Sequence, residues 1–422
     1  MAETGKLRDT ITSMAREAKE AAAGLLGLSG ADKNRVLRRV AELLEDNRAL
    51  LKQENEKDLQ AGRAAGLSAA MLDRLTLSDK VIEAMIDGLG EVCGLADPVG
   101  TVEHLTLRPN GLQVGRMRVP LGVIAMIYES RPNVTIDAAA LCLKTGNAVI
   151  LRGGSEAIHS NLALARVIEQ ALTEAGIGAR AVQVVPVTDR QAVRELLQQD
   201  DAIDLVIPRG GEGLIRSVTE MSRIPVLKHY KGVCHIYVDK DADLGKATPI
   251  ILNGKTQRPG VCNALEGLLV HRSIAAGYVP AVVEALTSAG VEVRGCPASA
   301  ALSEQVRPAA ADDWGREFLD LILVLKIVDD MEEALTYIRR HGSQHTEVIL
   351  TENYTTARRF VSRVDASAVM VNASTRFNDG GQLGLGTEIG ISTTKLHAYG
   401  PMGLEELTTR KFVVFGEGQI RS

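Results

Sequence analysis

Short apolar runs rich in Val and Ile alternate with helical stretches in the chain from residue 122 onwards. Strands that are buried on both faces of a parallel sheet read as continuous apolar runs, and the crossovers between them are usually helices. The alternation therefore predicts an α/β fold with parallel-rich sheets. The runs fall into two sets, before and after Cys262, which predict two three-layer α/β domains. The first set comprises residues 122–128, 148–153, 182–186, 203–210, 225–229 and 234–239, and the second comprises residues 265–271, 319–328, 347–353 and 367–374.

The segment that precedes this alternation, residues 6–95, is predicted to be helical. Apolar residues recur at helical spacing from Asp32 to Lys57, and Asp32 can serve as the N-cap of that helix. Ser78 can cap the next helix.

A β-hairpin is predicted at residues 105–120, because Asn110 and Gly111 both tolerate positive φ. Residues 408–416 are also strand-like. A two-stranded ribbon is marginal on its own. One interpretation is that both segments belong to a protruding sheet that pairs with a second subunit, and the alternative is an ordinary hairpin folded back on its own domain.

The composition argues against several classes of protein. The chain has 422 residues and a formal net charge of −5, whereas nucleic-acid binders usually carry a basic patch. No apolar run reaches the roughly 18 residues of a transmembrane helix, so no membrane partner is expected. The five cysteines are odd in number, widely spaced and without a CxxC motif, which predicts neither a disulfide framework nor a metal site. A reducing, cytoplasmic location is therefore expected.

Two loops rich in Gly and Arg follow predicted strands, where open parallel sheets bind their ligands. Glycine lets backbone N–H groups approach a phosphate, and arginine can bind one with two hydrogen bonds. Two such loops suggest a dinucleotide, and an arginine near the ribose favours NADP. Each loop alone fits a plain strand–helix turn equally well, and no GxGxxG motif follows a strand. The first loop contains Arg152, Gly153, Gly154 and Ser155, and the second contains Pro208, Arg209, Gly210 and Gly211.

Cys262 stands in the segment NGKTQRPGVCNALE, residues 253–266, together with Lys255 and Arg258. A nearby cation lowers the pKa of a thiol and raises its thiolate fraction. A lone cysteine is nevertheless more often a buried structural thiol, so this pattern leaves both roles open. Histidines near predicted strand ends are likewise more typical of polar surface or hydrogen-bonding residues than of catalytic ones. They are His229, His345 and His397.

Six blocks of sequence resemble those of the gamma-glutamyl phosphate reductases, a branch of the aldehyde dehydrogenase superfamily. They cover the chain from about residue 100 almost to its end. The resemblance implies an aldehyde dehydrogenase-like fold, with a cofactor-binding domain, a catalytic domain and a small β oligomerisation appendage. The blocks are YESRPNVT (128–135), LRGGSEAIHSN (151–161), IPRGGEGLI (207–215), NGKTQRPGVCNALE (253–266), HGSQHTEVI (341–349) and STRFNDGGQLGLGTEIGIST (374–393).

The resemblance also implies how the chain is divided. The expected parts are an N-terminal helical part of the cofactor-binding domain (1–104), the hairpin of the appendage (105–121), a dinucleotide-binding domain (122–240), a catalytic domain carrying Cys262 (241–375), a return segment to the cofactor domain (376–400) and a C-terminal appendage strand (401–422).

Several site residues follow from the resemblance. Cys262 matches the family nucleophile, and Asn133 matches the oxyanion-binding asparagine. Arg152 stands where related dehydrogenases carry a lysine that touches the adenosine ribose, and Glu317 matches a glutamate that holds the nicotinamide ribose. In hydrolytic aldehyde dehydrogenases a water-activating glutamate occupies the position of His229. The expected substrate-binding residues are Arg131, Arg258, Arg376, His229 and His345.

The activity implied by the resemblance is the NADPH-dependent reduction of L-glutamyl 5-phosphate to L-glutamate 5-semialdehyde and phosphate. It proceeds through a Cys262 thioester and is the second step of proline biosynthesis from glutamate. A homo-oligomer is expected, and the upstream glutamate kinase is a candidate partner. The competing hypotheses are a hydrolytic aldehyde dehydrogenase that works in the oxidative direction and a non-catalytic α/β assembly protein.

Overall fold

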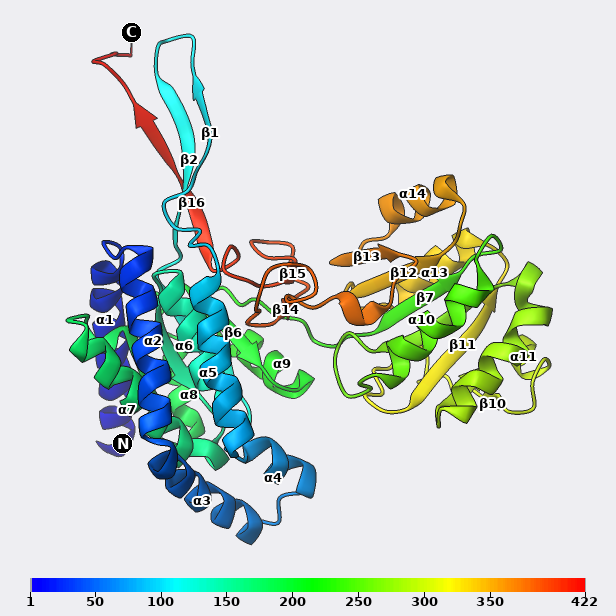
Figure 1. Cartoon of the computed structure of the whole chain (residues 1–422), viewed down its shortest axis with the longest axis horizontal. Helices are drawn as coiled ribbons and strands as arrows, with labels where there is room; N and C mark the ends of the chain where they lie inside the picture. The colour runs from blue at the N-terminus through cyan, green and yellow to red at the C-terminus, as the bar shows by residue number, and fades with distance from the viewer. Residues whose placement is uncertain (1, 422) are drawn as a thin grey trace. The chain divides into compact units, whose positions relative to one another are not determined.

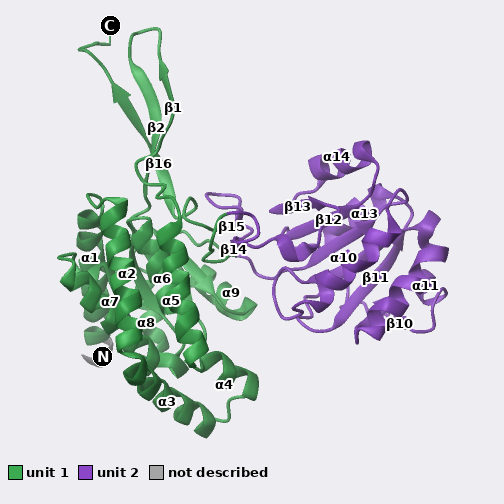
Figure 2. Cartoon of the chain, in the orientation of Figure 1, with its two compact units in different colours: residues 1–228, 385–390, 402–422 green, residues 229–384, 391–401 purple. Residues whose placement is uncertain are grey.

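The structure is a computed structural model that describes residues 2–421, without the side chains of residues 2–4. The chain forms two compact units, which Figure 2 distinguishes by colour. Unit 1 contains residues 1–228, 385–390 and 402–422, and unit 2 contains residues 229–384 and 391–401. The chain therefore passes between the units four times, and neither unit is continuous in sequence.

Five helices form the N-terminal part of unit 1 (Figure 1). Ser29, and not Asp32 as the sequence suggested, caps the second of them. The Ser29 side chain accepts the N–H of Asp32, and the Asp32 carboxylate accepts the N–H of Ser29, which is a capping box. The predicted cap Ser78 is confirmed. The helices are α1 (Ala2–Leu25), α2 (Gly30–Asp46), α3 (Arg48–Ala64), α4 (Ala69–Leu75) and α5 (Asp79–Gly94).

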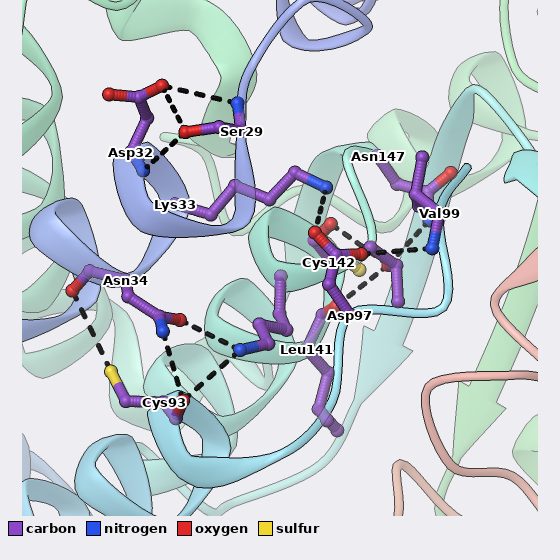
Figure 3. Close-up of polar contacts among 12 residues, drawn as sticks. Ser29, Asp32, Lys33, Asn34, Cys93, Asp97, Val99, Leu141, Cys142 and Asn147 are labelled. Carbon is purple, nitrogen blue, oxygen red and sulfur yellow. Dashed lines mark hydrogen bonds and ion pairs between the residues drawn. The ribbon is translucent and has the colours of Figure 1, made fainter. Parts of the chain in front are cut away.

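Two buried lysines tie these helices to the rest of unit 1, and Figure 3 labels one of them, Lys33, beside Asp97. Lys33 Nζ of α2 lies 2.8 Å from Asp97 Oδ2 in the segment after α5. Lys144 Nζ donates to Asn34 Oδ1 at 2.8 Å and to the carbonyl oxygen of Cys93 at 3.3 Å. Burial of a charged group is costly unless it is paired, so these contacts fix the position of α2.

The central sheet of unit 1 is parallel, with the strand order β5-β4-β3-β6. Its strands are β3 (Val123–Tyr128), β4 (Ala148–Arg152), β5 (Val182–Val184) and β6 (Leu205–Arg209). The helices between and after these strands are α6 (Asn133–Lys144), α7 (Ile158–Glu174), α8 (Arg190–Leu196) and α9 (Glu212–Met221). Two short 3-10 turns, η1 (Ser155–Ala157) and η2 (Ala179–Ala181), complete this part of the unit. The expected strand at residues 225–229 is wrong, because only an isolated bridge joins Val226 to Val206.

The hairpin and the C-terminal strand-like segment form one antiparallel sheet of unit 1, as expected. Its order is β1-β2-β16, with β1 (Val102–Leu107), β2 (Gln113–Pro120) and β16 (Thr408–Phe415). Gly111 adopts φ 85° in the turn, which explains the glycine there. This sheet, hereafter the appendage, exposes several large apolar side chains: Leu105, Leu107, Phe412, Val414 and Phe415.

Unit 2 is built on a seven-stranded parallel sheet with the order β10-β9-β11-β8-β7-β12-β13. Its strands are β7 (Cys234–Val238), β8 (Leu265–His271), β9 (Glu292–Gly295), β10 (Arg307–Pro308), β11 (Ile322–Val328), β12 (Thr346–Leu350) and β13 (Ala368–Val371). Residues 234–239 fall in the first set of strands predicted from the sequence. The structure instead places β7 between β8 and β12, and the chain leaves unit 1 after Lys228.

Helices cover both faces of this sheet, which makes unit 2 three-layered. On one face, alternate strand residues pack with α10 (Leu244–Thr256) and α11 (Arg272–Ser288). On the other face they pack with α13 (Met331–His341) and α14 (Tyr354–Arg363). Short elements complete the unit: α12 (Pro297–Ala300), the 3-10 turn η3 (Thr375–Phe377), β14 (Ile391–Ser392) and β15 (Gly400–Pro401). Among the residues described, no helix combines the length and apolar character needed to cross a membrane.

Candidate active site

Cys262 lies in the short segment that joins α10 to β8. The adjacent strands β7 and β12 begin at Cys234 and Thr346, so all three parallel strands start at the same edge of the sheet. This shared edge brings together residues that are far apart in the sequence. The residues around Cys262 thus lie at the amino ends of the strands, whereas the two loops predicted to bind a cofactor follow the carboxyl ends of β4 and β6.

The backbone around Cys262 is held by close contacts within unit 2. The thiol of Cys234 donates to the carbonyl oxygen of Cys262, with a sulfur–oxygen distance of 3.2 Å. A Cβ atom on Gly232 would lie only 1.9 Å from the same oxygen. The two segments can therefore approach this closely only with glycine at position 232.

Two predicted substrate-side histidines stand beside the thiol. One ring nitrogen of His229, one of His345 and Cys262 Sγ all lie within 4.8 Å of one another. The His229 Nδ1–H donates to the carbonyl oxygen of Ile391 at 2.7 Å. Because a carbonyl oxygen only accepts, Nε2 is the unprotonated nitrogen of the neutral His229 ring.

His345 is fully buried, and Thr346 Oγ1 lies 2.8 Å from its Nδ1. Burial, with a smaller contribution from the neighbouring His229, lowers the pKa of His345 to about 3. The imidazole is therefore uncharged at neutral pH.

Two predicted arginines also gather near Cys262. Arg376 Nε donates to Gln257 Oε1 at 2.8 Å. Burial and then the adjacent positive charge of Arg258 lower the pKa of Arg376, while the charges of Asp379 and Cys262 oppose this. Two guanidinium groups close enough to repel each other favour an anionic ligand between or beside them.

Glu317 lies close to this site, but in a structural contact. Its Oε1 accepts the backbone N–H of Gly232 at 2.9 Å, and Lys231 Nζ donates to the carbonyl oxygen of Gly315 at 3.0 Å. These bonds hold the turn that packs against the backbone of Cys262.

A buried ion pair lies beneath the same segment. Lys255 Nζ and Glu266 Oε2 are 2.8 Å apart, and both side chains are almost completely buried. Burial raises the pKa of Glu266 to about 7, although the charge of Lys255 opposes this. Lys255 thus forms its ion pair with Glu266. The sequence had suggested Lys255 as a cation beside the thiol.

The remaining predicted residues belong to unit 1. Arg152 ends β4, and its guanidinium donates to the carbonyl oxygens of Gly153 at 2.7 Å and Thr188 at 3.0 Å. Its Nε atom is buried and has no hydrogen-bond partner within the described residues. Burial lowers the pKa of Arg152, the negative charge of Glu156 opposes this, and the positive charge of Arg190 adds a smaller lowering effect. A second cation therefore lies close to Arg152.

A carboxylate lies against each of the two predicted phosphate loops. A Cβ on Gly154 would lie 2.1 Å from Glu156 Oε1, and this oxygen also accepts the N–H of Ser130 at 3.0 Å. Glu129 Oε2 accepts the N–H of Gly211 at 3.1 Å. A phosphate at Gly211 would therefore have to displace Glu129.

The last two predicted residues lie at the start of α6. Asn133 begins the helix, and its Nδ2 donates to Asp137 Oδ2 at 3.0 Å. Arg131 is exposed just before the helix.

Known proteins resemble this chain over its whole length. The profile of the aldehyde dehydrogenase family matches residues 5–298. The chain belongs to the aldehyde dehydrogenase family. It is 65% identical to the gamma-glutamyl phosphate reductase of Desulfotalea psychrophila, over 99% of this chain and 100% of that relative.

Solved structures of this family share the fold. The crystal structure of the gamma-glutamyl phosphate reductase of Thermotoga maritima superposes with a TM-score of 0.96 at 48% identity, covering 98% of this chain and 100% of that one. The glyceraldehyde-3-phosphate dehydrogenase of Methanocaldococcus jannaschii, complexed with NADP, has a TM-score of 0.67 at 16% identity, covering 97% and 95%. The chain thus has the aldehyde dehydrogenase-like fold and belongs to a family of oxidoreductases.

Sequence reasoning missed the residues that support Cys262 through the backbone or from the next strand. They are Gly232, Cys234, Thr346 and Ile391. Each of them adjoins a strand end, but only the order of strands in the sheet shows that these ends meet.

Proposed function

We propose that this chain reduces L-glutamyl 5-phosphate to L-glutamate 5-semialdehyde and phosphate with NADPH, the second step of proline biosynthesis from glutamate. The observation that carries the proposal is the setting of Cys262, beside His229, His345 and the two arginines of the same edge. An anionic substrate with an electrophilic acyl carbon suits this setting. The name of the relatives with 57–65% identity supports the choice of substrate.

In the proposed reaction the Cys262 thiolate attacks the acyl carbon and forms a C–S bond. The bond from that carbon to the phosphate oxygen breaks, and the departing phosphate takes up one proton. His229 can accept the proton of the Cys262 thiol and give it to the phosphate. Arg258 and Arg376 are proposed to bind the phosphate or the substrate carboxylate, because guanidinium matches both in geometry. Arg131 and His345 are further candidates for substrate contacts.

When bound, NADPH supplies the hydride that reduces the Cys262 thioester to the aldehyde. Asn133 and the backbone N–H of Cys262 are proposed to stabilise the oxyanion of the tetrahedral species. Loss of one such donor typically costs about 3–4 kcal/mol of transition-state stabilisation. Collapse of the tetrahedral species breaks the C–S bond and returns Cys262 to the thiolate.

The cofactor residues in unit 1 fit a phosphorylated ribose best at Arg152. Its buried Nε, which has no partner among the described residues, and the nearby charge of Arg190 suit the 2′-phosphate of NADP, whereas the carboxylate of Glu156, which acts on Arg152 more strongly than Arg190 does, opposes an anion there. Gly153, Gly154 and Ser155 would line the same position. The second loop, Pro208–Gly211, is a weaker fit because Glu129 occupies the N–H of Gly211. Glu317 is proposed to contact the nicotinamide ribose with the carboxylate that now holds Gly232.

His229 also favours a reaction that ends at the aldehyde. Hydrolysis of a thioester requires a base that activates water, and the resemblance places His229 where hydrolytic relatives carry that carboxylate. A histidine whose Nδ1 is tied to a backbone carbonyl has one nitrogen for proton exchange with the thiol.

The proposal extends to assembly and location. The exposed apolar side chains of the appendage fit pairing with a second copy of the chain. We propose a cytoplasmic homo-oligomer, with the upstream glutamate kinase as a candidate partner because an acyl phosphate is labile.

The reverse reaction tests the function directly. Glutamate 5-semialdehyde, NADP and inorganic phosphate are supplied to the wild type and to Cys262→Ala, and NADPH absorbance is followed. We expect phosphate-dependent formation of NADPH by the wild type and its loss in Cys262→Ala. Cys296→Ala, which removes another thiol of unit 2, is the matched control and should retain activity.

Three results would overturn the proposal. NADPH formed equally well without phosphate would identify a hydrolytic aldehyde dehydrogenase. An unchanged rate in Cys262→Ala would return that thiol to a packing role, and an inactive wild type would favour the non-catalytic assembly protein.

A further inference from the structure

The thiol and the two imidazoles at the amino edge of the sheet form a set of metal-binding groups. His229, Cys262 and His345 each offer one ligand atom, and these atoms all lie within 4.8 Å of one another. The three residues come from segments that precede three adjacent strands, so the sheet holds them in place. No metal site is predicted from the sequence, because its cysteines are odd in number, widely spaced and without a CxxC motif.

The hydrogen bonds of the two imidazoles match those of metal-binding histidines. Such histidines usually donate their second nitrogen to a backbone carbonyl or another acceptor, which fixes the tautomer. His229 donates Nδ1–H to the carbonyl oxygen of Ile391 at 2.7 Å. His345 Nδ1 lies 2.8 Å from the hydroxyl of Thr346, which can accept. When Nδ1 is the donor in these contacts, each ring carries its lone pair on Nε2.

A second observation independently points to a ligand. His345 Nε2 is buried and has no hydrogen-bond partner within the described part of the chain. A buried polar atom left unsatisfied typically costs about 1–3 kcal/mol. A metal ion that accepts the lone pair of this nitrogen would remove that cost.

The chemical type of the three ligand groups determines which metal ion the site would prefer. A thiolate and two imidazoles are ligands that favour Zn²⁺ over Mg²⁺ or Ca²⁺, which prefer oxygen. With Zn–S near 2.3 Å and Zn–N near 2.1 Å, tetrahedral ligand atoms lie about 3.3–3.7 Å apart. The present separations allow this geometry after shifts of about 1 Å. Three protein ligands leave the fourth position open to water.

We propose that His229, Cys262 and His345 form a reversible Zn²⁺ site that inhibits the enzyme. Zn²⁺ bonds to the Cys262 sulfur, and the thiol proton is released to solvent. The lone pair that would attack the acyl carbon is then held by the metal. Inhibition, unlike binding, rests on the proposed function.

Co²⁺ is the spectroscopic probe of binding, because a cobalt–thiolate bond gives a charge-transfer absorption in the near ultraviolet. Co²⁺ is titrated into the full chain under reducing conditions, and Zn²⁺ is then added to displace it. We expect a stoichiometric band in the wild type that Zn²⁺ and EDTA abolish. Cys262→Ser should lose the band, and His345→Asn and His229→Asn should each weaken Co²⁺ binding at least about tenfold.

Cys296→Ala and His271→Ala are the matched controls and should bind Co²⁺ as the wild type does. Circular dichroism shows whether each variant is folded, and His229→Asn, at a half-buried position, provides the test if the buried His345→Asn does not fold. Absence of the band in the wild type would overturn the site. A band that persists unchanged in His229→Asn and in any folded His345→Asn would also overturn it.

The reductase assay separates the two proposals. If the wild type is active, shows no cobalt band and is not inhibited by Zn²⁺, the metal site is refuted and the proposed function stands. If the wild type is inactive but shows the cobalt band, and the variants weaken it as expected, the function is refuted and the metal site is supported. Inhibition of active wild type that EDTA reverses supports both.

Discussion

Gly232 lacks a side chain because the carbonyl oxygen of Cys262 occupies the space in which one would begin. A Cβ there would also lie 2.8 Å from Cys262 Cα, so the obstacle is backbone and cannot rotate away. The Gly232 N–H is meanwhile held by Glu317. The position of the Cys262 backbone therefore depends on the absence of a side chain at Gly232 and on the Glu317 carboxylate.

Gly232→Ala should displace the Cys262 segment and reduce the reverse reaction by at least about 100-fold, since misplacement of a reacting group by about 1 Å can have that effect. The measurement is the phosphate-dependent rate of NADPH formation, together with thermal unfolding to show that the variant folds. Gly260→Ala is the control, because its nearest neighbour to a new Cβ is a backbone oxygen at 3.8 Å. Equal rates in Gly232→Ala and the wild type would contradict this account.

The Lys255–Glu266 pair should be strongly coupled. Above about pH 7, where Glu266 is ionised in the folded state, Glu266→Gln leaves the buried Lys255 ammonium without a carboxylate, which typically costs about 3–5 kcal/mol of unfolding free energy. The double variant Lys255→Met, Glu266→Gln removes both charges and should recover most of that loss. Urea unfolding of the wild type, both single variants and the double variant measures the coupling. Additive single losses would show that the pair is not coupled.

The same pair predicts a pH dependence. The pKa of Glu266 is raised from 4.5 to about 7 in the folded chain, so the folded state keeps a proton that the unfolded state has released. The contribution of Glu266 to stability is therefore present below about pH 4.5 and is lost as pH rises to about 7, by up to about 3 kcal/mol. Stability of the wild type relative to the double variant should fall between pH 5 and pH 7.5. A difference that is independent of pH would contradict the shift.

At the scale of elements, the site depends on the order of strands. β7, β8 and β12 are neighbours and parallel, so the residues just before them meet at one edge. The sequence predicted these strands, and the resemblance of the motif around Cys262 to a known family suggested the role of that residue, which stays a prediction. The sequence could not predict which strand ends meet, because apolar periodicity reports burial but not strand order. Gly232, Cys234 and Thr346 were missed for this reason.

The misplaced helix cap has a similar cause. Asp32 and Ser29 are both good N-cap residues, and a side chain at N3 resembles a cap in sequence. The error at residues 225–229 arose because an apolar run needs two neighbours to become a strand, and only Val226 bridges to Val206.

The link between α2 and the segment after α5 yields a prediction about elements. Asp97→Ala removes the partner of the buried Lys33 and should destabilise unit 1 by about 3–5 kcal/mol. Asp87→Ala removes an exposed carboxylate from α5 and should change stability by less than about 0.5 kcal/mol. Thermal unfolding of the two variants makes the comparison. Similar melting temperatures would show that the Lys33 contact contributes little.

At the scale of the whole molecule, the appendage needs segments from two distant parts of the sequence. Removal of residues 408–422 deletes β16 and leaves β1 and β2 as a two-stranded ribbon, which is marginal in water. We expect this truncation to aggregate or to lose its native size in size-exclusion chromatography. Removal of residues 417–422 keeps β16 whole and should leave both properties unchanged. Identical behaviour of the two truncations would contradict the structural role of β16.

The pairing of β16 with β2 also has a consequence for synthesis on the ribosome. About 290 residues separate the two strands, and β16 emerges after every other described strand. Until then the nascent polypeptide carries β2 with one edge open, so it is exposed to mispairing with neighbouring nascent chains during much of translation. A premature stop only a dozen codons before the end of this sequence would therefore release a protein with that edge open and most of both units already made.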